Sequence, residues 1–435
     1  MILKYQFQNY RSFSAQTELS FVASSQRTLN DNLIRVNGKR ILPSAVIYGA
    51  NASGKSNIIS SIELFREIVL RGTISASDNR LLANLQIIPF IYDSEEHPVS
   101  FSICFISNGK QIQYDLTIYV GSIEYHSRKI LRESLTVWHG NKKIILFERD
   151  GNAVDLNMKK TALKEMGVDQ KYIREVLSRI NQNVDDTSLF LTGGFKSAIS
   201  VELANTVYEF FDKQMFVISS FDDMLEKGTI SVKMPQKYAN TKEFVFWNRV
   251  LDAFFKGADF GDQRLIFEAK SDGDQPSSAK LISIYPHNGK QYGIPAELME
   301  SQGTLKLIKF VLLLQIGIAN GASFIIDEFD SSLHPEIARG ILELFHDPSF
   351  NKHGAQLIFS THNPIYLDNQ LFRRDQIMFV ERDRTSYQSA LYTLADFGSV
   401  DVRNDENYLI NYFRGKYSSM PYIDFRTVFK DNSEG

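Results

Sequence analysis

A glycine-rich octapeptide is the sequence feature that most constrains the fold of this chain. Residues 49–56 read GANASGKS, which fits the pattern G-x-x-x-x-G-K-[ST] at every fixed position. The short apolar stretch 45–48 precedes it, and residues 57–69 follow with a helical pattern. A strand that runs through such a turn into a helix forms a cradle for phosphate groups. The octapeptide therefore predicts an α/β domain that binds a nucleotide.

Each residue type in this cradle has a chemical task. Gly49 and Gly54 let the backbone wrap so that its N–H groups point at phosphate oxygens. Lys55 brings a positive charge to the β- and γ-phosphates, and the Ser56 hydroxyl is a ligand for Mg²⁺. The other cradle and first-turn residues expected to contact the nucleotide are Asn51, Ser53 and Asn57. We therefore expect ATP and Mg²⁺ as the cofactors.

A second apolar segment ends in two adjacent carboxylates, since residues 323–328 read SFIIDE. Such a strand is typical of a buried parallel sheet, where ligands bind at the carboxyl ends of the strands. Asp327 is expected to hold Mg²⁺, directly or through water. Glu328 is expected to orient and polarise the water that attacks the γ-phosphate. Alone, two such acids are also compatible with simple solvation, but the phosphate cradle upstream favours the catalytic interpretation.

A further phosphate-binding segment is predicted at residues 300–304, which read ESQGT. It offers the Ser301 hydroxyl and the Gly303 backbone at the start of the apolar helical stretch 305–318. The N-terminus of a helix favours negative charge, so this segment is suited to a phosphate group.

Two more segments follow the carboxylates. Asp330 opens the stretch 330–335, DSSLHP, in which His334 is expected to start a helix and to have no chemical role. Residues 357–363 form another apolar strand that ends in His362. This histidine is placed to hydrogen-bond the γ-phosphate.

In this order, the segments resemble ABC-type ATPases of the SMC and DNA-repair branch. In that branch the signature serine and glycine of one subunit complete the site of the other. The resemblance therefore implies a head-to-tail dimer or a larger, even-numbered homo-oligomer. Residues 9–13, NYRSF, resemble the branch's opening N-F-R-S, whose arginine reaches the phosphates. The resemblance implies that Arg11 contacts the nucleotide phosphates. The alternative is that Arg11 is a charged residue on the protein surface without a role in binding. The Q-loop glutamine stays open between Gln86 and Gln111.

A narrower resemblance covers nearly the full chain and is carried by four short segments in order: QFQNYRSF at 6–13, IPF at 88–90, LFER at 146–149 and YFRGKY at 412–417. They are similar to stand-alone ABC ATPases of bacterial abortive-infection operons, which include the AbiL and RloA group and the AriA component of the PARIS antiphage system. This resemblance implies a cytosolic defence ATPase that assembles as an oligomer. It also implies a phage protein as the trigger and a separately encoded TOPRIM-type nuclease as the effector.

The chain divides into three predicted parts. Residues 1–150 combine the phosphate cradle with several short β-rich runs, as in an ATPase lobe with an antiparallel β subdomain. Residues 151–262 have apolar positions at helical spacing but no sustained heptad, which predicts a helical insertion without a coiled-coil arm. Residues 263–435 alternate strands and helices again, as in the second lobe of an ABC-type α/β ATPase head, and they carry the signature, the carboxylates, the histidine and a C-terminal tail.

The composition indicates the cellular location of the chain and limits its classes of binding partner. The single cysteine, Cys104, excludes an intrachain disulfide and favours a reducing, cytoplasmic location. The longest apolar run, 310–319, is about half of what a membrane span needs, so we expect a soluble chain without membrane contact. The net charge of −3 and the pI near 6.3 do not favour a protein dedicated to binding nucleic-acid phosphates. They do not exclude a local basic groove, so nucleic-acid binding stays open.

Two other functions compete with the defence ATPase. An SMC-like DNA-repair ATPase would bind duplex DNA, but the acidic pI and the missing coiled coil favour the first interpretation. An ATPase with its own C-terminal nuclease needs a glutamate strand followed by an Asp-x-Asp strand. After His362 the chain offers Glu381, Asp383 and Asp396, and neither these nor residues 401–403 supply that pattern.

The tail after His362 leaves two interpretations open. Its apolar residues are either core packing, with Gly415 ending a helix, or part of a binding surface. In the second case Tyr412, Phe413, Arg414 and Tyr417 would form an exposed aromatic and basic patch for a partner.

Overall fold

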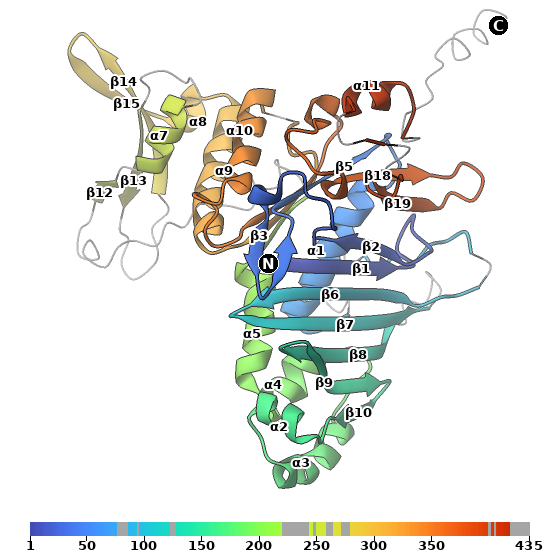
Figure 1. Cartoon of the computed structure of the whole chain (residues 1–435). Coiled ribbons are helices and arrows are strands. Elements are labelled where there is room, and N and C mark those ends of the chain that lie inside the picture. Colours follow the sequence, from blue (N-terminus) through green and yellow to red (C-terminus); the bar gives the residue numbers. More distant parts are fainter. Residues whose placement is uncertain are drawn as a thin grey trace, which may run out of the picture.

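The computed structural model describes residues 1–75, 86–93, 95–121, 128–219, 243–246, 249–257, 264–270, 279–331, 333–398, 402–403 and 406–417. Within these ranges, sheets of seven, six, four and two strands are connected by helices, as Figure 1 shows.

The six-stranded sheet carries the phosphate cradle. Its strand order is β11 (Met215–Ile218), β16 (Ser323–Ile326), β17 (Gln356–Ser360), β5 (Ser44–Gly49), β18 (Ile377–Arg382) and β19 (Ser389–Thr393). All neighbours in this order are parallel except β18 and β19. Every residue of β5, β16 and β17 is buried, as expected for parallel strands that are covered on both faces.

Successive residues of β5 point into two different hydrophobic cores. Ile47 packs in a core with α1 (Lys55–Arg71) and the seven-stranded sheet. Val46 packs in another core with α9 (Gln302–Ala319) and α10 (Pro335–His346). Because side chains alternate along a strand, the run of apolar residues in β5 fills both cores at once.

The seven-stranded sheet is antiparallel. Its strand order is β10 (Ala153–Leu156), β9 (Lys142–Asp150), β8 (Arg128–His139), β7 (Lys110–Val120), β6 (Val99–Ser107), β1 (Ile2–Gln8) and β2 (Thr17–Ser20). One face packs on α1, where the Phe65 ring stacks on Phe101 at 5.3 Å and on Tyr114 at 5.9 Å between ring centroids. The expected α/β fold with an antiparallel β part is therefore confirmed.

The segment that follows this sheet is helical, as the periodicity predicts. It contains α2 (Lys160–Met166), α3 (Gln170–Gln182), a π-helical turn (Leu191–Phe195), α4 (Lys196–Ala198) and α5 (Val201–Lys213). It also contributes β10 to the antiparallel sheet and β11 to the six-stranded sheet. Each of these strands has only four residues, too few for a period-2 pattern to stand out.

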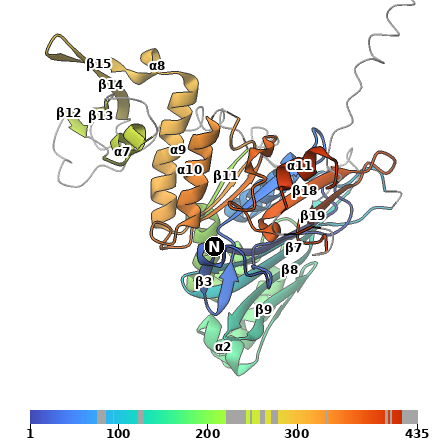
Figure 2. The ribbon, with the colours of Figure 1, turned by 45° about the horizontal axis from the view of Figure 1, so that its top comes forward.

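A four-stranded antiparallel sheet lies between β11 and α9 in the sequence. It consists of β12 (Glu243–Phe246), β13 (Arg264–Lys270), β14 (Ala279–His287) and β15 (Lys290–Pro295), accompanied by α7 (Arg249–Gly257) and α8 (Ala296–Met299). Figures 1 and 2 show this sheet at the edge of the molecule, on the side of α9 that faces away from α1. Its first strand and α7 lie in the segment 151–262, for which the periodicity predicts a helical insertion, so this sheet differs from the expectation.

The remaining elements are short: β3 (Ile34–Val36), β4 (Lys39–Ile41), α11 (Tyr408–Phe413) and the 3₁₀ turns Asn30–Asn32, Pro364–Tyr366 and Arg374–Gln376. Among the described residues, α9 alone is long and apolar enough to cross a membrane by length and composition. Its Phe310 packs edge-on against Phe324 and Phe329, and several of its other residues are buried. Helix α9 is therefore a partly buried helix that contributes to the hydrophobic core.

The tail combines both interpretations left open by the sequence. Tyr412 and Tyr417 are buried, and both rings pack against Phe379. Phe413 is 60% exposed and Arg414 is exposed beside it. The idea that all four residues form an exposed patch is therefore wrong for the two tyrosines. Gly415 follows α11 with φ +71 and ends it as predicted, since its N–H bonds to the Tyr412 carbonyl at 2.9 Å.

Candidate nucleotide-binding site

Three parallel strands end at the same edge of the six-stranded sheet. Strand β17 lies between β5 and β16, with Ser360 opposite Ile47 and Phe359 opposite Ile326. The phosphate cradle, the paired carboxylates and the histidine follow these three strands directly. The topology therefore brings together three motifs that span more than 300 positions of the sequence.

The cradle is closed around the side chain of Lys55, which is buried. The Lys55 ammonium donates to the carbonyl oxygens of Gly49 at 2.8 Å and Ala50 at 3.1 Å. The loop turns through left-handed backbone at Ala52 (φ +60) and Gly54 (φ +117). Burial lowers the pKa of the Lys55 ammonium, while the nearby carboxylates of Asp327 and Glu328 act in the opposite direction.

Ser360 fixes the two carboxylate residues. Its hydroxyl donates to Asp327 Oδ1 and accepts from the backbone N–H of Glu328 at 2.9 Å. Glu328 itself has φ +47, a left-handed conformation that non-glycine residues adopt at a cost and that is often found at functional sites. Its side chain is exposed at the edge of the sheet. Ser360 was not among the predicted site residues, although it occupies the last position of the β17 strand.

His362 lies beside these carboxylates. Its Nε2 is 4.0 Å from Glu328 Oε1, and both side chains are exposed. Partial burial and the charge of Lys55 lower the pKa of the imidazole, against the opposing effect of Glu328, Asp327 and Asp330. The ring is therefore mainly neutral at pH 7, when it can donate one hydrogen bond. Thr361, the preceding residue, donates to Asp330 Oδ1 at 2.7 Å and anchors this loop.

The N-terminal arm reaches the first turn of α1. Arg11 has φ +51, and its Nη1 donates to Asn57 Oδ1 at 3.5 Å. The guanidinium lies 5.3 Å from the centroid of the Tyr10 ring. Arg11 Nε is buried and has no acceptor among the described residues, so this arginine retains a donor for a further group.

Two serines that were not among the predicted site residues, Ser12 and Ser389, hold the cradle from outside. Ser389, in β19, donates its hydroxyl proton to the Ser53 carbonyl at 2.6 Å, and its backbone N–H bonds to the Ser12 carbonyl at 2.6 Å. The Ser12 hydroxyl lies 2.8 Å from Ser389 Oγ and accepts from Asn57 Nδ2 at 2.8 Å. A Cβ on Gly54 would lie 2.7 Å from Ser389 Oγ and 2.9 Å from Ser12 Oγ, so only glycine fits there.

The predicted signature lies elsewhere on the chain. Ser301 caps α9, and its hydroxyl accepts from the Thr304 N–H at 3.1 Å. Ser301 is exposed, and Gly303 follows in the first turn. Figures 1 and 2 both show the start of α9 beside α8, apart from the end of α1 that carries the cradle. One chain therefore does not bring Ser301 and the cradle together.

The structure separates the two candidates for the Q-loop glutamine. Gln111 lies in β7, where its side chain bonds to Cys104 Sγ at 3.4 Å. Gln86 is exposed and lies two residues before Ile88, whose carbonyl accepts from the Arg11 N–H at 2.8 Å. Gln86 is therefore the candidate that lies near the arm of the nucleotide site. His334 caps α10 through Nδ1, which confirms its prediction as a helix-start residue.

The residues at this edge fit ATP and Mg²⁺. The described residues contain no group of three or more His, Cys, Asp or Glu side chains that could hold a metal by themselves. Mg²⁺ commonly takes one or two protein oxygens together with nucleotide phosphates, which the exposed Ser56 hydroxyl and the Asp327 carboxylate can supply. Ser53 Oγ is buried without a partner among the described residues, and it adds a further polar atom in the cradle.

Comparisons with known proteins give two kinds of result. A search among curated proteins gave no match. Among solved structures, the chain is similar to "SMC head domain from Thermotoga maritima" at 16% identity, with a TM-score of 0.37 and 90% of this chain and 98% of that chain covered. It is also similar to "Crystal structure of the SmcHead bound to the C-winged helix domain of ScpA", at 14% identity, with a TM-score of 0.37 and 90% and 97% covered. Residues 44–368 match the family described as "AAA domain, putative AbiEii toxin, Type IV TA system", and the chain belongs to this family of P-loop ATPase domains.

Proposed function

We propose that this protein binds and hydrolyses ATP and that it acts as the regulatory ATPase of an antiphage defence system. The convergence of Lys55, Asp327, Glu328 and His362 at one sheet edge supports the hydrolytic part of this proposal most directly. A mere nucleotide-binding site needs the cradle, but it does not need an exposed carboxylate 4.0 Å from a mainly neutral histidine.

In this proposal each side chain has one task. Lys55 neutralises the β- and γ-phosphates, and Ser56 and Asp327 hold Mg²⁺, which supplies further charge neutralisation when bound. Glu328 accepts a proton from the attacking water and orients it. His362 donates a hydrogen bond to the γ-phosphate, and Arg11 offers its guanidinium to the phosphates from the N-terminal arm.

The site is completed by a second copy of the chain. Ser301 and Gly303 lie on an exposed helix start, apart from the cradle of their own chain. Leu298 is 76% exposed and Met299 is 47% exposed immediately before Ser301. Large apolar side chains that flank a phosphate-binding helix start favour a contact between subunits. We therefore propose a head-to-tail homo-oligomer in which this face covers the nucleotide of the neighbouring copy.

The defence role rests on the family and on the narrower resemblance of four short segments. In this role the protein acts in the cytoplasm, with a phage protein as the proposed trigger and a separate TOPRIM-type nuclease as the proposed effector. Exposed Phe413 and Arg414 offer a surface for that effector. An SMC-like repair ATPase that binds duplex DNA is the competing function, and DNA-stimulated ATP hydrolysis without any nuclease partner would favour it.

The hydrolytic function is tested with Glu328→Gln. We expect ATP affinity close to the parental value and a loss of turnover of at least about a hundredfold, because the variant lacks the base that positions water. Glu343→Gln is the matched control, since Glu343 is an exposed carboxylate on α10 that pairs with Arg339. Parental turnover in the Glu328 variant would contradict the proposed function.

A further inference from the structure

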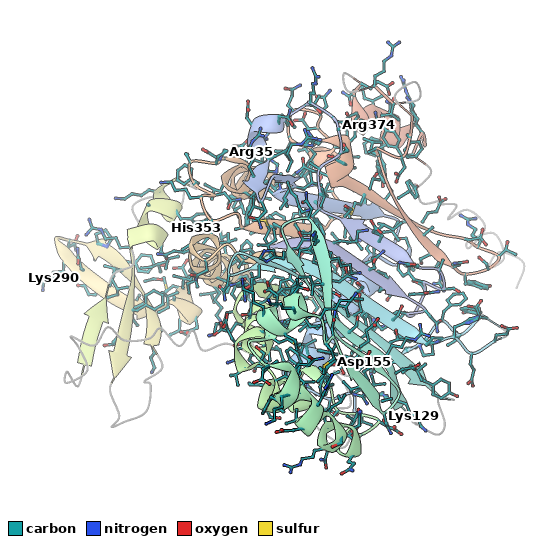
Figure 3. All side chains as sticks on the ribbon, turned by 60° about the horizontal axis from the view of Figure 1, so that its bottom comes forward. Arg35, Lys129, Asp155, Lys290, His353 and Arg374 are labelled. Atoms are coloured by element: carbon teal, nitrogen blue, oxygen red, sulfur yellow. The ribbon has the colours of Figure 1, made fainter. Side chains whose placement is uncertain are left out.

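A pocket of about 430 Å³ lies in the helical segment that follows the antiparallel sheet, far in sequence from the cradle. Helix α3, the connection after it and the π-helical turn Leu191–Phe195 form its walls. Figure 3 shows this helical segment from below, beside the strands that carry the labelled Lys129 and Asp155. The volume is in the range of small-molecule sites, and π-helical turns occur frequently at functional sites.

The inner part of this pocket is apolar, and polar and charged residues lie around it. Ile180, Leu189 and Phe190 are buried and form its inner part. Arg179 is exposed at its edge, and its guanidinium has no acceptor among the residues that the structure describes. The lining also carries the Asp185 carboxylate, whose Oδ1 accepts from the Thr187 N–H at 2.7 Å, the Thr187 hydroxyl at 3.0 Å and the Ser188 N–H at 2.7 Å. A ligand therefore meets an apolar floor, one cation without a described acceptor and one carboxylate that is hydrogen-bonded to its own loop.

The wall of the pocket is attached to the far end of the helix that begins at the cradle. Helix α1 starts with Lys55 and ends at Gly72, whose carbonyl accepts from the Leu189 N–H at 2.8 Å. The Ile74 N–H donates to the Thr187 carbonyl at 2.9 Å. A Cβ on Gly72 would lie 2.5 Å from Thr192 Oγ1, so this contact leaves no space for a larger residue.

A second connection runs through a buried carboxylate. The N–H groups of Phe190 and Leu191 each donate to Glu133 at 2.8 Å. Glu133 also accepts from the Tyr114 hydroxyl at 3.0 Å, and the Tyr114 ring stacks on Phe65 of α1 with an interplanar angle of 2°. The pocket wall is therefore connected to α1 by hydrogen bonds and by ring packing.

We propose that this pocket binds a small apolar molecule that carries an anionic group, and that its occupation is coupled to nucleotide binding through α1. The pocket site goes beyond the proposed function, whereas the coupling rests on it. The anionic group pairs with Arg179, and the apolar body replaces water over Ile180, Leu189 and Phe190. Coupling of this kind is reciprocal, so ATP and the pocket ligand change each other's affinity by the same factor.

The probe for the site is 1-anilinonaphthalene-8-sulfonate, which has an apolar body and one sulfonate and fluoresces when bound. Gly193 lines the pocket and has open space where a side chain would start, so Gly193→Leu adds an apolar side chain at the pocket wall with room for its Cβ. Gly340→Leu is the matched control, because Gly340 is exposed on α10 and also has open space. We expect at least about a tenfold loss of probe affinity in the first variant and none in the second. Equal affinity in both, with unchanged melting temperatures, would overturn the site.

The charge is tested in the same titration. Arg179→Gln should weaken the probe severalfold, whereas Arg174→Gln, an exposed arginine on the same helix, should not. Octanoate should displace the probe at lower concentration than octanol or octylamine. Better displacement by octylamine would contradict the anionic class of ligand.

The coupling is measured by repeating the titration with Mg²⁺ and ATP in the Glu328→Gln protein. Probe affinity should change at least about fivefold, and this change should be absent in Gly193→Leu. ATP binding is measured separately by calorimetry, so a failure of nucleotide binding is distinguished from a failure of coupling. Bound ATP with unchanged probe affinity would overturn the coupling.

Discussion

Ser389 Oγ lies 2.6 Å from the carbonyl oxygen of Ser53, so a strand near the C-terminal end of the described chain holds the phosphate cradle. The same serine bonds through its backbone to Ser12 in the N-terminal arm. Three segments that are distant in sequence therefore fix the loop through hydrogen bonds within the protein. Such preorganisation lowers the entropic cost of binding.

Ser389→Ala tests this relationship. The variant loses the bond to Ser53 and leaves the Ser12 hydroxyl with one partner fewer, which costs about 1 kcal/mol or about fivefold in ATP affinity. Calorimetric titration with ATP gives the affinity. Ser386→Ala, in the exposed turn of the same hairpin, is the control. If both variants bind ATP equally well, Ser389 does not position the cradle.

The buried His346 predicts a loss of stability in acid. Its Nε2 lies 2.6 Å from Ser44 Oγ, at the start of β5, and burial lowers its pKa from 6.5 to about 4. Between these two values the unfolded chain binds a proton that the folded chain excludes. The free energy of unfolding therefore falls as pH decreases through this window, by about 2 kcal/mol between pH 7 and pH 5.

Urea unfolding at both pH values measures this effect. His346→Gln keeps a hydrogen-bonding side chain and should show a shallower decrease, because it does not titrate. His353→Gln should keep the parental decrease, since His353 is exposed. An identical pH dependence in the His346 variant and the parent would show that this histidine is not responsible.

The exposed part of the tail predicts a separable effector surface. Replacing Phe413 and Arg414 with alanine should leave ATP turnover and melting temperature near parental values, because both side chains are exposed and their buried neighbours Tyr412 and Tyr417 are retained. Co-purification of the nuclease effector should be lost. Phe350→Ala removes a phenyl ring that is 62% exposed elsewhere and serves as the control. Unchanged co-purification would show that the effector docks on another surface.

The sequence predicted the parts of this protein that are determined by local chemistry. The cradle pattern from Gly49 to Ser56 and the apolar strands predicted the α/β fold, because strict spacing and burial on both faces leave few alternatives. The contacts of Ser389 with Ser53 were not predictable, since a serine in a polar strand end has no pattern of its own.

Two other differences between the sequence-based expectations and the structure also arise because tertiary contacts leave no local pattern in the sequence. The four-stranded sheet β12–β15 was not predicted because its strands lack clear alternation, and because β12 and β13 are separated in sequence by α7. In the tail, Tyr412 and Phe413 are adjacent aromatic residues, and the sequence pattern does not predict which of them faces the core. The packing of Tyr412 on Phe379 decides this, and it depends on the tertiary structure.

The shared site is tested most directly by mixing two inactive chains. Lys55→Ala removes the phosphate charge, and Ser301→Arg blocks the exposed start of α9. In a head-to-tail pair, the Ser301→Arg chain keeps an intact cradle and receives an intact signature from the other chain.

An equal mixture should therefore recover about a quarter of parental ATP turnover, because about half of the pairs are mixed and each mixed pair has one complete site out of two. Lys55→Ala mixed with Glu328→Gln should recover nothing, since both changes affect the half-site that one chain builds alone. No recovery in the first mixture, with mixed assembly confirmed, would contradict a nucleotide site shared between two copies.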